Sequence, residues 1–117
     1  MNGFDSVVID SRTEVAEGKW EVRLTVPSTS SYFQGHFPAF HLLPAVATVD
    51  IVTLLASEIL GRTLEISSIS KTKFTSPLVP DTGAVFKLDL TKPGTVLYSS
   101  SLVNGQLCSK GLLRYKP

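Results

Sequence analysis

The chain has 117 residues, of which 43% are hydrophobic and 18% are charged, so it is long enough to bury one core and too apolar for an intrinsically disordered protein. Its formal net charge is +1 and it has no block of basic residues, which argues against electrostatic binding to nucleic acid. Cys108 is the only cysteine, so an internal disulfide and a cysteine-based zinc site are excluded.

The sequence also lacks the usual marks of export and membrane insertion. The first residues do not show the basic and then apolar pattern of a secretory signal. No stretch approaches the ~18–20 uninterrupted apolar residues of a membrane span. We therefore expect a cytoplasmic protein with one domain over residues 1–117, bound to neither membrane nor nucleic acid.

The N-terminal part predicts two strands around a turn. Residues 7–9 form a short apolar run, and Gly18 falls in the turn. Residues 20–26 alternate between apolar and polar side chains, which indicates a strand with one buried face. An irregular segment rich in aromatic residues follows at 32–41 and contains both histidines, His36 and His41.

The next segment predicts the one long helix. Pro44 suits a first helical turn, residues 45–60 include good helix formers, and Gly61 is a plausible stop. The helix is apolar on nearly every side, so we expect the fold to enclose it.

The remaining sequence predicts four further strands, at residues 64–74, 85–90, 95–103 and 106–115. The last two flank Asn104-Gly105, which is a strong hairpin signal. An antiparallel sheet wrapped around the helix accommodates this element order, which makes the fold class α+β.

Asp50 and His36 are the residues best suited to chemistry. Asp50 stands in the middle of the apolar helix, where an ionised carboxylate without a partner is costly to bury. A histidine is the usual general base near neutral pH, and a desolvated aspartic acid can serve as general acid. A structural reading remains open, in which Asp50 bonds to a neighbouring loop or reaches solvent.

Other candidates are weaker. His36, His41 and Asp50 have side chains that suit zinc, but one loop and one helix do not obviously bring them together. The run of serines at 99–101 lacks the glycines of a nucleophile turn, and Cys108 reads as a small core residue. We expect Glu58, near the end of the helix, to face solvent.

The segments 33–38 and 42–46, FQGHFP and LLPAV, resemble a motif of the hot-dog-fold 3-hydroxyacyl-[acyl-carrier-protein] dehydratases of the FabA and FabZ kind. The motif of that family reads G-H-F-P-G-x-P-x-x-P-G-x-x-x-x-E/D. This chain aligns with it without a gap, so that His36 and Asp50 fall on the catalytic positions, fourteen residues apart. Residues 69–81 and 8–26 are similar to the family's later strand and turn and to its first hairpin.

The chain departs from the family pattern at several positions. Ala39 and Ala45 replace glycines, and His41 displaces a proline. Most basic residues near the proline turn are replaced, although Lys71 and Lys73 remain. A compact, specialised relative of the aryl-polyene ApeI-like branch fits these departures.

The resemblance implies a dehydratase that converts a 3-hydroxyacyl thioester into the trans-2-enoyl thioester. His36 would be the general base and Asp50 the general acid. Substrate contacts would come from Gly35, Phe37, Pro44 and Ala45, with no metal and no other cofactor. The implied partners are an acyl thioester on acyl carrier protein or coenzyme A, and a second copy of the chain, in a homodimer whose two subunits share each active site.

Two other functions remain open on the same fold. One is an acyl thioesterase in which Asp50 activates water. The other is a catalytically degenerate subunit that binds acyl groups, an alternative motivated by Ala39 and Ala45.

Overall fold

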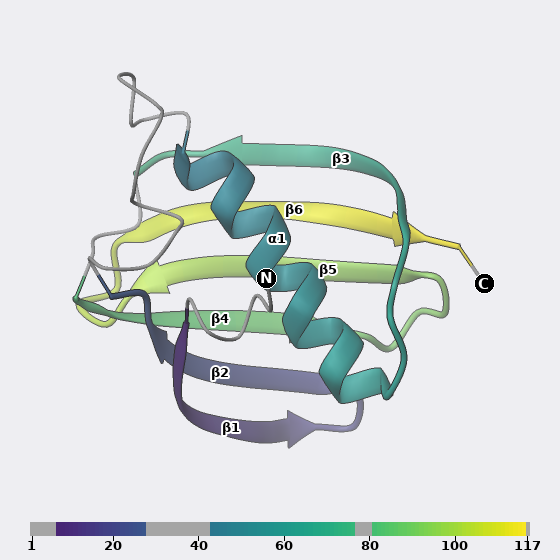
Figure 1. The fold of residues 1–117 in the computed structure, drawn as a ribbon, viewed down its shortest axis with the longest axis horizontal. Coiled ribbons are helices and arrows are strands. Elements are labelled where there is room, and N and C mark those ends of the chain that lie inside the picture. Colours follow the sequence, from purple (N-terminus) through teal and green to yellow (C-terminus); the bar gives the residue numbers. More distant parts are fainter. Residues whose placement is uncertain (1–6, 28–42, 77–80, 117) are drawn as a thin grey trace.

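The computed structural model describes residues 7–27, 43–76 and 81–116. Within these ranges one helix lies across one face of a six-stranded sheet (Figure 1). The helix is α1 (Leu43–Leu60), and the strands are β1 (Val8–Ala16), β2 (Lys19–Thr25), β3 (Ile66–Phe74), β4 (Gly83–Asp89), β5 (Thr95–Leu102) and β6 (Leu107–Tyr115). All the strand pairs are antiparallel, so the predicted α+β class and its sheet around a helix are confirmed.

The sheet order is β1-β2-β4-β5-β6-β3. Three neighbouring pairs are hairpins of consecutive strands, whereas β2 pairs with β4 and β3 pairs with β6 across long stretches of sequence. As a result, β1 and β3 form the two edges of the sheet (Figure 1).

The predicted end of the helix is confirmed at Gly61. This glycine has a φ of +73°, a left-handed conformation that residues with a side chain rarely adopt. The backbone N–H of Arg62 donates to the carbonyl of Ser57 at 3.1 Å, and the N–H of Gly61 donates to that of Glu58 at 3.3 Å. This pair of bonds is a Schellman motif, which satisfies carbonyls that the helix leaves without partners.

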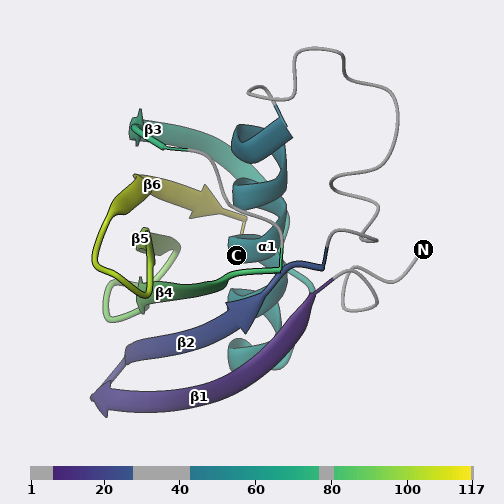
Figure 2. The same cartoon turned by 90° about the vertical axis from the view of Figure 1, so that its left-hand side faces the viewer.

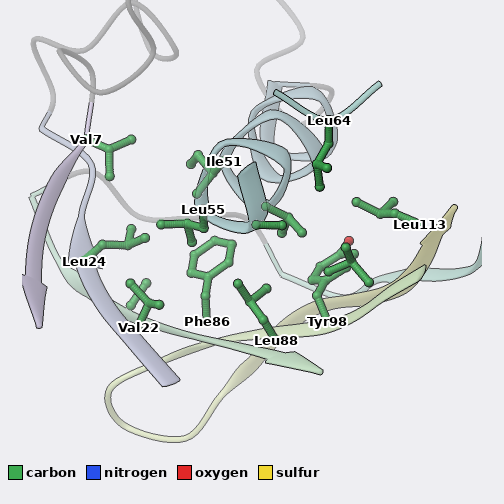
Figure 3. Packing of buried hydrophobic residues seen from close by; sticks show 14 of the residues in the cluster. Val7, Val22, Leu24, Ile51, Leu55, Leu64, Phe86, Leu88, Tyr98 and Leu113 are labelled. Atoms are coloured by element: carbon green, nitrogen blue, oxygen red, sulfur yellow. The ribbon is translucent and has the colours of Figure 1, made fainter. Parts of the chain in front are cut away.

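The core lies between α1 and the sheet face that it crosses. Strand side chains alternate between this face and the opposite one, and most of those on the inner face of β2, β4, β5 and β6 are buried. Figure 3 shows Phe86 of β4 pointing toward Ile51 and Leu55 of α1. The buried apolar residues of the strands and the helix include Val22, Leu24, Phe86, Leu88, Val96, Tyr98, Leu113, Ile51, Val52, Leu55 and Ala56.

The sheet covers only one side of the helix (Figure 2). Asp50, Glu58 and Leu60 are exposed, and Val49 and Leu54 are only half-buried. Over the described ranges 7–27, 43–76 and 81–116, the expectation that the fold encloses α1 on all sides is therefore not met. No helix in the described ranges has the length and hydropathy that crossing a membrane requires.

The edge strands depart from regular pairing. In β1 the register shifts between Glu14 and Ala16, which makes Val15 an extra residue, and in β3 it shifts between Ser70 and Lys73. The predicted two-residue hairpin between β5 and β6 is instead a loop over residues 103–106. Gly105 has a φ of +94°, but Asn104 does not have the positive φ that a type I′ turn needs at both central positions.

Candidate active site

Helix α1 places Asp50 on its side facing away from the sheet. The buried face of the helix is formed by Thr48, Ile51, Val52, Leu55 and Ala56. Asp50 falls between these positions and is exposed, with half-buried Leu54 one turn later on the same side. The carboxylate therefore stands on an outward face that is partly apolar, and not within the core of its own chain.

The start of α1 offers backbone donors. Leu43, Pro44 and Ala45 form the beginning of the helix, and the first turn carries no acidic side chain. The first N–H groups of a helix have no partner within it, and the helix dipole favours negative charge at this end. Pro44 has no N–H, so Ala45 is an early position with a free backbone donor in the helical pattern.

The loop half of the predicted site is not described. Gly35, His36, Phe37 and His41 lie outside the described residues. Within the described ranges, no three histidine, cysteine or acidic side chains form a group able to hold a metal ion.

Glu58 faces solvent, as the sequence predicts. Its carboxylate pairs with the guanidinium of Arg12 on β1, and about a third of each side chain is exposed. This ion pair links the last turns of α1 to β1. The two acids of the helix therefore differ in role: Glu58 holds α1 to β1, whereas Asp50 is the candidate catalytic residue.

The serine and cysteine candidates are structural. Ser100 is buried, and its hydroxyl shares a 2.6 Å hydrogen bond with that of Ser109 on the neighbouring strand. Cys108 is 1% exposed, and burial raises the pKa of its thiol. A buried thiol with a raised pKa is a poor nucleophile, so the expectation that Cys108 is a core residue is confirmed.

The structure also has a hollow that the sequence did not predict. The sheet face opposite α1 carries a hollow of about 620 Å³, to which every strand contributes. Four lysines line it: Lys19, Lys71, Lys87 and Lys110. They are far apart in sequence and come together only through the strand order, so no local pattern could have indicated them.

Comparison with known proteins places the chain in a family. The model of the ApeI-like family, described as ApeI dehydratase, matches residues 12–112. A curated relative, the 3-hydroxyacyl-[acyl-carrier-protein] dehydratase FabZ of Clostridium botulinum strain Hall, is 33% identical over 97 residues, which cover 76% of this chain and 67% of the relative. The FabZ of Clostridium perfringens strain SM101 is 24% identical and covers 96% and 88% of the two chains.

Solved structures agree with this assignment. A chain of the dehydratase heterocomplex ApeI:P from Xenorhabdus doucetiae has a TM-score of 0.79 and 29% identity, covering 94% of this chain and 97% of that one. The PaaI protein of Escherichia coli, with a TM-score of 0.60 and 15% identity over 95% of this chain and 82% of its own, shares the fold alone. The observed sheet and helix are thus those of the hot-dog fold.

The motif around Asp50, the hot-dog architecture and the match over residues 12–112 lead to the same assignment. The chain belongs to the ApeI-like dehydratase family and is a hydro-lyase related to the FabZ enzymes.

Proposed function

We propose that this enzyme removes water from a 3-hydroxyacyl thioester, carried by an acyl carrier protein, to give the trans-2-enoyl thioester. The family and its FabZ relatives support the reaction type. The observation that carries the proposal is the position of Asp50, a carboxylate in mid-helix on the side of α1 that its own sheet leaves uncovered.

In the proposed reaction two side chains move two protons. The imidazole of His36 removes a proton from C2 of the acyl chain, and Asp50 donates a proton to the 3-hydroxyl group. The C3–O bond breaks as the C2–C3 double bond forms, and the hydroxyl leaves as water. Each side chain then returns to its starting state when the proton on His36 is passed back through solvent to Asp50.

The start of α1 supports the charge that develops in this reaction. As the C2 proton leaves, negative charge grows on the thioester oxygen, and the N–H groups of Gly35 and Ala45 would bind it. The absence of an acidic side chain in the first turn leaves the helix dipole free to favour that charge. Losing one such donor typically costs roughly 3 kcal/mol of transition-state stabilisation. Phe37 and Pro44 would form apolar walls beside the reacting carbons.

The site is proposed to form between two copies of the chain. A general acid works best when water is excluded, yet Asp50 is exposed in a single chain. Strand β3 is an edge strand on which Ile69 and Phe74 are 46% and 44% exposed. Pairing of β3 across a homodimer would extend the sheet, cover the outer side of α1 and bring the His36 loop of one subunit to Asp50 of the other.

Complementation tests this shared site. His36→Ala and Asp50→Ala should each abolish dehydration while leaving the folded structure intact. Mixing the two inactive variants under conditions of subunit exchange should restore part of the activity, because some heterodimers carry one intact site. Glu58→Ala is the matched control, since it removes a carboxylate from the same helix, and it should retain activity. Full exchange without any recovery would contradict the shared site.

The product distinguishes dehydration from thioester hydrolysis. Mass spectrometry of 3-hydroxyacyl carrier proteins after incubation should show loss of one water while the acyl group stays attached. Release of free thiol without formation of the enoyl product would instead indicate a thioesterase. Equal turnover of the coenzyme A thioester would contradict the preference for carrier protein. Binding of acylated carrier protein without turnover would indicate a degenerate subunit.

A further inference from the structure

The hollow on the sheet face opposite α1 has the dimensions and lining of a small-molecule site. Its volume of about 620 Å³ lies within the range of roughly 300–1,000 Å³ that is typical of ligand pockets. Lys87, Leu97 and Ser99 alternate along their strands with core residues, so their side chains project away from α1. In Figure 2 this face is on the left of the sheet, with α1 on the right.

The walls of the hollow are apolar. Leu97 and Val15 are 51% and 59% exposed, large fractions for aliphatic side chains, and both line it. The carbon stems of the lysines add further apolar surface beneath their charged ends.

The charges in the hollow are unevenly distributed. Asp89 accepts two hydrogen bonds from Thr91, and it is the cross-strand partner of Lys19. Glu21 pairs with Arg23 at 3.9 Å and lies opposite Lys87. The two acids that line the hollow are therefore on β2 and β4 and are already engaged with neighbours.

The other half of the hollow is cationic. Lys110 on β6 lies opposite Ser99 on one side and opposite another cation, Lys73, on the other. Among the described residues, Lys71, Lys87 and Lys110 form no ion pair. Like charges placed directly across a sheet repel each other, so this arrangement favours a bound anion over the empty site.

Lys71 is held in this position by a strained backbone. It sits in the irregularity of β3 opposite β6 and has a φ of +54°, in the region where glycine is the favoured residue. A side chain retained in such a conformation suggests a role for that side chain. On the other edge of the sheet, the irregularity of β1 likewise places Val15 in the lining.

We propose that this hollow binds an amphipathic anion, a small molecule with an aliphatic body and one acidic head, either carboxylate or phosphate. The apolar body would lie against Leu97 and Val15, and the head would bind Lys71 and Lys110. The site lies on the sheet face opposite Asp50 and does not depend on the dehydration reaction.

Isothermal titration calorimetry gives a direct readout of binding to this hollow. The full-length protein is titrated with decanoate, decyl phosphate, decanol and inorganic phosphate. Decanoate and decyl phosphate should give saturable changes, and the tighter of the two identifies the preferred head. Decanol and inorganic phosphate should each bind at least about fivefold more weakly, because decanol lacks the acidic head and inorganic phosphate lacks the aliphatic body. Equal binding of decanol and decanoate would overturn the assignment, as would no saturable change with either anion.

Variants test the named residues. Lys110→Gln should weaken decanoate binding by up to about fivefold, the effect of one exposed charge pair. Lys92→Gln is the matched control, because Lys92 is exposed on the turn after β4 and does not line the hollow, and it should leave binding unchanged. Lys71→Gly should raise the melting temperature by relieving the positive φ and at the same time weaken binding. A Lys71→Gly variant that keeps full affinity would contradict the role of Lys71.

A second copy of the chain is the competing occupant. Leu97→Asp places a charge on the apolar wall and should abolish decanoate binding without changing the molecular mass in analytical ultracentrifugation. A lower mass for this variant than for the wild type would show that the hollow is an interface between copies, and it would overturn the proposal.

Discussion

Substituting alanine for Gly111 on β6 adds a single methyl group and so tests how tightly the sheet is packed there. A Cβ there would lie 3.0 Å from Cε1 of Tyr98, its cross-strand partner on β5, and 3.0 Å from Cγ2 of Thr72 on β3. Both distances are below ordinary van der Waals contact, so at least one neighbour must move. Tyr98 is 2% exposed beneath α1 and cannot turn away, whereas Thr72 is exposed on the edge strand.

The expected cost of Gly111→Ala follows from these contacts. Overpacking a buried site usually costs about 1–3 kcal/mol. Replacing glycine with alanine also lowers the conformational entropy of the unfolded chain, which stabilises the folded state by about 0.4–1 kcal/mol. We therefore expect the free energy of unfolding to fall by about 1–2 kcal/mol, or a melting temperature lower by about 4–8 °C for a chain of this size.

Urea denaturation at one fixed protein concentration measures this change, and two further variants locate its cause. Thr72→Ser removes the Cγ2 contact and should recover less than half of the loss, because the buried ring is the obstacle that remains. Gly83→Ala is the matched control: its Cβ also meets a side-chain atom at 3.0 Å, but Val103 is 59% exposed and free to rotate. That control should change stability by less than about 0.5 kcal/mol. A neutral Gly111→Ala, or full recovery by Thr72→Ser, would refute the assignment of the cost to Tyr98.

Three further predictions concern stability and reactivity. The side-chain and backbone hydrogen bonds from Thr91 lower the pKa of Asp89, so this carboxylate stabilises the fold at neutral pH and the stabilisation is lost as the pH falls through the folded-state pKa. Thr91→Val should raise that pKa in an NMR titration, and its stability deficit should shrink toward acidic pH. Burial and a raised thiol pKa should make Cys108 react with a disulfide reagent only as fast as the chain opens, and reaction in seconds under native conditions would contradict this. Phe86→Ala should cost about 3–5 kcal/mol in urea denaturation, since Phe86 is fully buried against α1, and a loss below 1 kcal/mol would contradict that placement.

Local patterns were sufficient to predict most of the elements. The alternation in residues 20–26 and 85–90 predicts β2 and β4 because each strand buries one face, and Gly61 marks the helix end because its backbone is left-handed. The extent of the β5–β6 loop was not predicted, since Asn104 does not adopt the conformation that a two-residue turn requires.

Non-local features could not be predicted in this way. The pairing of β3 with β6 depends on the whole topology, and β3 gives almost no burial pattern because it is an edge strand with nearly every residue exposed. The hollow depends on the same topology, because Lys71 reaches it only through the irregular register of β3. For the site, the sequence predicts Asp50 as an acid on an apolar helix, but the direction in which it faces requires knowledge of which helical stripe the sheet covers.

The side chains on the outer side of α1 bear on the proposed homodimer. A helix that needed only the sheet could have a polar outer side, yet Leu54, one turn after Asp50, is apolar and only half-buried among the described residues. An apolar side chain on that side is stabilised when another surface covers it, and the same cover would desolvate the neighbouring Asp50. The proposed homodimer would therefore account both for the apolar Leu54 on the outer side of α1 and for the exposed carboxylate of Asp50.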